Sequence, residues 1–265
     1  MLKNNPYGAS TSGLVVQGAD NLVLSGVLSD VGRLTKNGSG TLTLTGDNTG
    51  GGTTTVDVGA LLQIGTGGTS GSLAGDIAND GTLVVDRSDA IGLSGAISGA
   101  GGLTKNGAGT LTLSGVNTYT GGTTLTAGTL AAASDNNLGG ASGGLTFNGG
   151  TLQVMGTSWT STNRAVSLQA GGGTFDIEDA ANNFAVTQGV AGAGGLTKSG
   201  SGTLTLSGAN SYTGATTVSA GTLTQGAAGG FSTASSRYDV DTDGTLDLGG
   251  FDTVLAALTM PAQST

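Results

Sequence analysis

Residues 103–130 read LTKNGAGTLTLSGVNTYTGGTTLTAGTL, and residues 196–223 read LTKSGSGTLTLSGANSYTGATTVSAGTL. The two stretches share 21 of 28 positions, and residues 34–61, LTKNGSGTLTLTGDNTGGGTTTVDVGAL, share 18 of 28 with the first of them. The similarity extends upstream in each case, and the homologous blocks are 20–61, 89–130 and 182–223. An internal repeat of this kind predicts a fold built by stacking copies of one structural unit.

A shorter unit lies inside these blocks. The pattern Gly-Thr/Ala-Leu/Phe recurs along the chain with a mean spacing of about 23 residues. In GTLTL, Leu42 and Leu44 face one side of a strand, whereas Thr41 and Thr43 face the other. No segment keeps a helical period, so the strands recur without crossover helices. The predicted fold is therefore all-β, a right-handed single-stranded parallel β-helix (solenoid) of about ten to eleven coils of ~23 residues.

A β-propeller is the main alternative, because a block of about 42 residues matches the length of one propeller blade. Blades should repeat at a single period. The equivalent positions of the three repeats are instead 69 and 93 residues apart, which argues against blades.

The alternation predicts one inward-facing residue per coil, stacked in a single column. That column comprises Leu42, Leu61, Leu83, Leu111, Leu130, Leu152, Phe175, Leu204, Leu223 and Leu246. GALLQIG at 59–65 has one residue more than the GTLQIG form, and a one-residue slip turns every later side chain to the opposite face. We therefore expect a β-bulge near Leu61–Gln63.

The composition excludes several classes of chemistry. The 265 residues include 54 Gly but no Cys and no His, which removes disulfides, Cys-ligated zinc and His-based triads. Eight basic and 17 acidic residues give a net charge of −9, which argues against nucleic acid as a partner. No apolar run is long enough for a transmembrane helix.

The predicted boundaries follow from the repeats. Residues 1–19 form an N-terminal cap or first coil, residues 20–252 form the β-helix, and residues 253–265 form a C-terminal edge or truncated coil. The segment TVLAALTM at 253–260 is apolar, so we expect an open strand edge that lets chains associate end to end. The start of the sequence has no signal-peptide pattern, so the chain could be secreted only as a piece of a longer protein.

The string GAGGLTKSGSGTLTLSGANSYTGATTVSAGTL at 192–223 resembles the autotransporter-associated β-strand repeat, also called the passenger-associated transport repeat. Residues 99–130 resemble it as well. The copy at 30–61 departs from the pattern, with Gly50 and Gly51 in place of Tyr119 and Thr120.

The resemblance implies a β-helical passenger segment of a type V secreted autotransporter, located outside the cell or on the bacterial surface. It implies a structural, non-catalytic stalk or adhesin that supports export, adhesion or aggregation. A cell-surface glycan or protein receptor and a translocator barrel in the outer membrane, elsewhere in the parent chain, are also implied. The alternatives are a carbohydrate-active β-helix enzyme, meaning a polysaccharide hydrolase or lyase, and a self-associating extracellular fibre protein.

An acidic cluster is the candidate for catalysis. Asp176 and Glu178 are expected on one outward face, ~7 Å apart, with Asp179 next to them. Such a spacing suits an inverting glycosidase. No Arg or Lys lies near the cluster in sequence to complete a pectinase-like site, so we favour a solvated strand face and predict that the chain is not an enzyme.

DVDTDG at 239–244 is the candidate for metal binding. Asp239, Asp241 and Asp243 occupy positions 1, 3 and 5 of a calcium loop, with Gly244 at position 6. Position 12 is Gly250, where a Glu is required, and flanking helices are missing. We favour a turn at Asp243–Gly244 and predict no cofactor.

Four other patterns are candidate binding surfaces. The pairs Thr41/Thr43, Thr110/Thr112 and Thr203/Thr205 resemble ice-binding faces, but the neighbouring coils carry other residues. Lys36, Lys105 and Lys198 share one repeat position, and Asn48, Asn117 and Asn210 share another. We expect the Lys side chains to keep a turn soluble and the Asn residues to favour left-handed turns. Tyr119, Tyr212 and Trp159 could stack on sugars, but structural packing is favoured for each.

Overall fold

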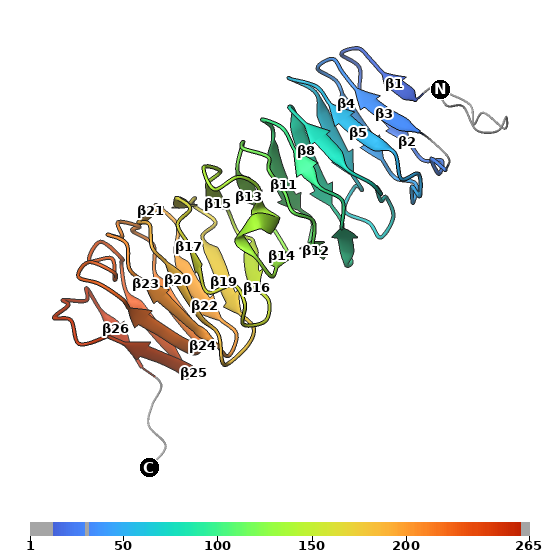
Figure 1. Ribbon diagram of the computed structural model, residues 1–265. Coiled ribbons are helices and arrows are strands. Elements are labelled where there is room, and N and C mark those ends of the chain that lie inside the picture. Colours follow the sequence, from blue (N-terminus) through green and yellow to red (C-terminus); the bar gives the residue numbers. More distant parts are fainter. Residues whose placement is uncertain (1–12, 30–31, 261–265) are drawn as a thin grey trace. The chain divides into compact units, whose positions relative to one another are not determined.

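The computed structural model describes residues 13–29 and 32–260. The chain divides into two compact units. Unit 1 comprises Met1–Thr123 and Asn136–Gly140, and unit 2 comprises Thr124–Asp135 and Ala141–Thr265. In each unit, parallel strands stack side by side as successive turns of a β-solenoid (Figure 1), with about twelve turns in all. The predicted parallel β-helix is confirmed, its turns slightly exceed the ten to eleven expected, and its right-handedness remains a prediction.

Unit 1 contains three stacks of parallel strands. The first is β1 (Leu14–Val16), β3 (Arg33–Lys36), β5 (Thr53–Val56), β7 (Ile77–Asn79) and β10 (Ile97–Ser98). The second is β2 (Leu22–Leu24), β4 (Thr41–Leu44), β6 (Leu61–Ile64), β8 (Thr82–Asp86) and β11 (Gly102–Asn106). The third pairs β9 (Ile91–Leu93) with β12 (Thr110–Leu113).

Unit 2 is built in the same way. One stack is β14 (Thr129–Ala132), β16 (Thr151–Val154), β19 (Gly173–Ile177), β22 (Leu196–Ser199) and β24 (Thr216–Gln225). Another is β15 (Leu145–Phe147), β18 (Val166–Leu168) and β21 (Val190–Gly192). The third is β17 (Ser161–Thr162), β20 (Asn183–Val186) and β23 (Thr203–Leu206), which also pairs with β24. The last strands are β25 (Tyr238–Asp247) and β26 (Leu258–Thr259).

Two further elements lie where the chain passes between the units. They are β13 (Thr123–Leu125) and a short 3-10 helix, Asp135–Leu138. Residues 1–12 of the predicted N-terminal cap or first coil, and residues 261–265 of the predicted C-terminal edge or truncated coil, lie outside the described residues.

Alternation along each strand fills the core, as the GTLTL pattern requires. In β12, Leu111 and Leu113 are buried, whereas Thr110 and Thr112 are half-buried on the outer face. Unit 2 adds aromatic rings to this core. Phe175 lies 5.1 Å from Phe147 and 6.4 Å from Phe184 between ring centroids. Each coil therefore encloses its own apolar interior.

At Gly40 and Gly109, the glycine that opens the GTL motif is required by the spacing of the coils. A Cβ atom on Gly40 would lie 2.1 Å from the carbonyl oxygen of Asp20, one coil earlier. The equivalent Gly109 would meet the carbonyl oxygen of Asp89 at 2.0 Å. Any side chain here would force the stacked backbones apart, which explains why Gly recurs at this position.

The single inward column is wrong, because the predicted residues fall into separate stacks. Leu83 is in register with Leu103 rather than Leu111, since β9 has been inserted and Leu111 pairs with Ile91. In unit 2, Phe175 is in register with Lys198, a residue outside the predicted column. Leu204 instead lies beside Phe184 and Leu223. The column breaks at the two longest spacings of the GTL motif, where an extra strand enters the coil.

Burial agrees with the predicted column at eight of its ten positions. These eight are fully buried: Leu42, Leu83, Leu111, Leu130, Leu152, Phe175, Leu204 and Leu223. Leu246 is in register with Leu223 but only half-buried, because β26 covers β25 only at Tyr238 and Asp239.

Leu61 is the second exception, and the predicted bulge is absent. Leu62 is the buried residue of β6, and it pairs regularly with Leu42 and Leu83. The additional residue lies upstream, in the turn that ends at Ala60, whose N–H donates to the carbonyl oxygen of Asp57. A turn absorbs an extra residue without disturbing the ladder, which explains why the strand stays regular.

Candidate functional site

The three lysines of the repeat are buried, contrary to the expectation that they keep a turn soluble. Lys36 is 1% exposed, and Lys105 and Lys198 are fully buried. Each lies near the end of a strand, on the same side as the inward Leu two residues earlier. Each Nζ donates to the carbonyl oxygens of the next two residues, at 2.5–2.8 Å. The lysine therefore caps the turn from inside.

Burial alters the acid–base behaviour of these amines. Desolvation lowers the pKa of Lys36 and of Lys105, and the Asp86 carboxylate opposes the change at Lys105. Burial lowers the pKa of Lys198 to about 8, and Asp176 acts in the opposite direction. Lys198 also donates to the carbonyl oxygen of Ala220 at 3.2 Å. These amines are thus occupied by backbone acceptors rather than presented to a ligand.

The repeated asparagines bridge neighbouring coils. The Asn117 Oδ1 atom accepts a 2.7 Å hydrogen bond from the N–H of Ile97, one coil earlier. Its Nδ2 atom donates to the carbonyl oxygen of Asn137, one coil later. Asn48 and Asn210 make equivalent bonds. The asparagine shared by the three repeats therefore joins three coils, a role that the expectation of left-handed turns did not include.

The repeated tyrosines are buried side chains, as the packing interpretation expected. The Tyr119 and Thr123 hydroxyls lie 2.6 Å apart, and those of Tyr212 and Thr216 lie 2.7 Å apart. Burial raises the pKa of Tyr212 far above its ordinary value. Trp159 is also buried, and its Nε1 atom donates to the carbonyl oxygen of Ser161. None of these rings forms an exposed platform for sugars.

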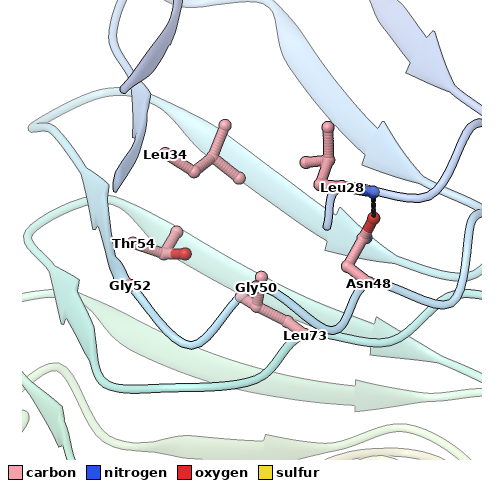
Figure 2. A pocket seen from close by; sticks show the side chains of 7 residues that line it. All are labelled: Leu28, Leu34, Asn48, Gly50, Gly52, Thr54 and Leu73. Carbon is pink, nitrogen blue, oxygen red and sulfur yellow. Dashed lines mark hydrogen bonds between the residues drawn. The ribbon is translucent and has the colours of Figure 1, made fainter. Parts of the chain in front are cut away.

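The first repeat has a cavity where the other two have tyrosine. The cavity measures about 10 Å³, room for about one water molecule. Its lining is shown in Figure 2 and consists of Leu28, Leu34, Asn48, Gly50, Gly52, Thr54 and Leu73. Gly50 occupies the position of Tyr119, and Thr54 occupies that of Thr123. The missing tyrosine therefore leaves space for only about one water molecule, so the lining residues have closed around most of the volume of the ring.

Two buried arginines, neither of them predicted from the sequence, hold long loops against the solenoid. Arg87 donates to the carbonyl oxygens of Thr69 and Gly71 and to the Asp89 carboxylate. Arg164, 1% exposed, forms a 2.9 Å salt bridge with Asp135 and also donates to its backbone carbonyl. Both loops are longer than the turns of the repeats. An Arg that follows a long insertion is therefore the sequence feature that could have identified these two anchoring residues.

The acidic cluster does not form a paired-carboxylate site. Asp176 is half-buried and accepts a 2.9 Å hydrogen bond from Gln153 on the neighbouring strand. Glu178 is exposed beyond the end of β19, and Asp179 accepts from the N–H of Ala181 in the following turn. Lys198 lies close to Asp176 in space, although not in sequence, but its amine binds turn carbonyls.

The segment that resembles a calcium-binding loop, residues 239–244, is part of a strand, so the predicted turn at Asp243–Gly244 is wrong. β25 runs through Tyr238–Asp247, and an irregularity opposite Val218 and Ala220 interrupts its pairing between Val240 and Asp243. Asp239 pairs with Arg237 at 2.6 Å. Over residues 13–29 and 32–260, no group of three or more acidic, His or Cys residues is placed to hold a metal ion.

The threonine pairs are distributed between the units. Thr203 and Thr205 lie in register with Thr222 and Thr224 on the next coil, but the coil beyond carries Asp247 in place of the second threonine. The equivalent column in unit 1 places Leu61 beside Thr41. A continuous face of threonine pairs is therefore not formed by these strands.

Comparison with known proteins assigns the three repeats to a repeat family. The model of the passenger-associated-transport-repeat matches residues 34–62, 103–132 and 196–224, so these three segments are copies of that repeat. The adhesin BmaC autotransporter of Brucella suis biovar 1 (strain 1330) is 41% identical over 98 residues. That alignment covers 37% of this chain and 3% of the relative. No solved structure matches the chain. No helix among the described residues has the length and apolarity needed to cross a membrane.

Proposed function

We propose that the chain is a structural, non-catalytic segment of an autotransporter passenger, carried outside the cell or on the bacterial surface. The observation that supports it most directly is the stacking of three passenger-associated transport repeats within a β-solenoid. In each repeat the lysine and asparagine bind the backbone of the solenoid itself. The lysine and asparagine of the repeat therefore serve to stabilise coils and to join neighbouring ones.

Adhesion is the role that we assign to such a segment, since the relative is named an adhesin. The outer surface is acidic, because five of the seven basic side chains in the described part are buried: Lys36, Arg87, Lys105, Arg164 and Lys198. Such a surface repels polyanions, including nucleic acid. The receptor that we propose is a neutral or basic glycan or protein on a cell surface, and the full-length chain is proposed to carry a translocator barrel.

Display on a cell tests the proposal. The segment is placed between a signal peptide and an autotransporter translocator domain in a Gram-negative host. Surface exposure is measured by antibody labelling of intact cells and by release with external protease, and adhesion is measured on host cells. We expect labelling and increased adhesion relative to the translocator alone. Retention of the segment inside the outer membrane, or display without adhesion, would contradict the corresponding part of the proposal.

Two matched variants show whether adhesion requires the folded segment or only its presence on the cell. Leu152→Asp places a charge in a fully buried position of unit 2 and should disrupt its coils. Thr151→Asp changes the adjacent, half-buried outer position of the same strand and should leave the coils intact. We expect only Leu152→Asp to abolish adhesion. A reducing-sugar assay of the purified chain on polysaccharides tests the enzyme alternative, and sustained sugar release would favour it.

Self-association is a second proposed property, supported by exposed apolar side chains around the last strands. Val254 is 82% exposed, Leu258 52% and Met260 55%. We propose that a second copy covers this edge, in an end-to-end contact between strands. Sedimentation across a concentration series should show association that is weakened in Leu258→Lys. A monomer at every concentration, or unchanged association in the variant, contradicts this proposal.

A further inference from the structure

Three Asn–Gly pairs occur in turns of the solenoid: Asn37–Gly38, Asn106–Gly107 and Asn148–Gly149. An Asn–Gly pair can lose its side-chain amide, because glycine has no Cβ to keep its backbone nitrogen away from the Asn Cγ atom. The surroundings of a pair therefore decide whether this chemistry is assisted or blocked.

The first pair lies against a buried ammonium group. Lys36 Nζ donates to the carbonyl oxygen of Asn37 at 2.7 Å and to that of Gly38 at 2.8 Å. The Asn37 carbonyl belongs to the same peptide group as the Gly38 N–H. A charge-assisted hydrogen bond to this carbonyl withdraws electron density and stabilises the deprotonated peptide nitrogen. That nitrogen is the nucleophile in amide loss.

Two polar groups of this pair, the Asn37 side-chain carbonyl and the Gly38 N–H, also have no hydrogen-bond partner among the described residues. Asn37 Oδ1 is buried with no hydrogen-bond partner. The Gly38 N–H donates to no group in the described part of the chain. Gly38 has a φ of 79° and is exposed to solvent, so water can reach the turn.

The third pair provides a contrast within the same molecule. Asn148 Oδ1 accepts a 3.0 Å hydrogen bond from the N–H of Gly171. The Gly149 N–H donates to the carbonyl oxygen of Gly172 at 2.8 Å. Both the electrophilic side chain and the nucleophilic nitrogen are thus held in other contacts.

We propose that Asn37–Gly38 is a self-modification site, at which the Lys36 ammonium assists loss of the Asn37 side-chain amide. The Gly38 nitrogen, having given up its proton to solvent, forms a bond to Asn37 Cγ. Nδ2 takes up one proton from solvent, the Cγ–Nδ2 bond breaks and ammonia leaves, which gives a five-membered succinimide. Water then adds to one ring carbonyl and opens the ring, giving Asp or isoaspartate. The net change is the uptake of one water and the release of one ammonia.

The product would carry a carboxylate on the residue whose backbone carbonyl binds the Lys36 amine. Lys36 takes part in no salt bridge with the residues at 13–29 and 32–260. The modification therefore supplies the first repeat with an acidic neighbour for its lysine. It also adds a negative charge to a surface that is already acidic.

Peptide mapping of the folded protein during prolonged incubation at neutral pH tests the proposal. The readout is the fraction of each Asn–Gly peptide that carries the mass change from amide to acid. We expect Asn37 to be modified at least about tenfold faster than Asn148, because one charge-assisted hydrogen bond assists the first pair while two hydrogen bonds restrain the third. In urea, where Lys36 no longer holds the turn, the two rates should converge. Equal rates in the folded protein, or an unchanged ratio in urea, would overturn the proposal.

Two variants complete the test. Asn37→Ser reproduces the Lys198–Ser199–Gly200 sequence of the third repeat, so the coil should fold while the modification disappears from this peptide. Lys36→Met should reduce the Asn37 rate toward that of Asn148 in protein shown to be folded by circular dichroism. An unchanged Asn37 rate in that folded variant would remove Lys36 from the reaction. If the variant does not fold, the comparison of folded and urea-treated parent chain decides.

Discussion

Lys198 Nζ lies 3.2 Å from the carbonyl oxygen of Ala220, a residue of the next coil in unit 2. The same amine binds the carbonyl oxygens of Ser199 and Gly200 in its own turn. A buried cation thus joins two coils without a salt bridge in the described residues. Its hydrogen bonds hold the turns together, while its desolvation opposes folding as long as the amine is charged.

The first prediction concerns pH. Burial lowers the pKa of Lys198 from 10.5 to about 8. Between these values the unfolded amine keeps a proton that the folded amine has lost, so the free energy of unfolding rises with pH. The slope contributed by one group is at most about 1.4 kcal/mol per pH unit. Urea denaturation from about pH 7 to 9.5, below the ordinary range of tyrosine, measures it.

Two variants isolate the lysine. Lys198→Met should lose this slope, whereas Arg237→Met, which removes an arginine whose side chain is 61% exposed, should keep it. A free energy of unfolding that changes with pH equally in the parent chain and in Lys198→Met would show that the slope comes from other groups.

The burial of the three lysines could have been predicted from the sequence. In LTK the residues Leu34 and Lys36 are two apart, so alternation places both on the inward face. The general tendency of Lys to be exposed led to the opposite expectation. The acceptors, however, are backbone carbonyls of a turn, and their convergence on one point depends on φ and ψ angles that the pattern does not specify.

The register of the stacked strands was predictable only over the stretches of chain between the two longest spacings of the GTL motif. Alternation identified Leu42 and Leu83 as inward residues, and both are buried. It could not show that β9 and β20 enter the coils at the two longest spacings, because a short strand in a Gly-rich chain resembles a loop. The cavity near Gly50 was partly predictable, since a missing tyrosine in one of three similar copies indicates missing volume.

The second prediction concerns the asparagine bridge. Asn117→Ala removes the bonds to the Ile97 N–H and the Asn137 carbonyl. Both groups lie in the solenoid interior, and an unsatisfied buried group costs about 1–3 kcal/mol. We expect a loss of about 2–4 kcal/mol in the free energy of unfolding, measured by urea denaturation. Val116→Ala, at an adjacent exposed position, should change it by less than about 0.5 kcal/mol. Similar losses in both variants would exclude a specific bridge.

The third prediction concerns the cavity of the first repeat. The cavity holds about one water molecule and a tyrosine side chain is many times larger, so Gly50→Tyr should overpack the coil and lower the free energy of unfolding by about 1–3 kcal/mol. Tyr119→Gly removes a fully buried ring from the second repeat and should cost about 3–5 kcal/mol. Urea denaturation of the two variants measures both changes. Stabilisation by Gly50→Tyr would show that the first repeat has kept the space of the missing ring.

The last prediction compares two neighbouring leucines of β6. Leu62 is fully buried between Leu42 and Leu83, whereas Leu61 is half-buried on the outer face. Leu62→Ala should therefore cost about 2–5 kcal/mol, and Leu61→Ala less than about 1 kcal/mol. Because each coil contacts mainly its neighbours, faster hydrogen exchange in Leu62→Ala should concentrate in β4, β6 and β8. A larger loss at Leu61, or exchange that rises equally over both units, would contradict the register and the local character of the solenoid's stability.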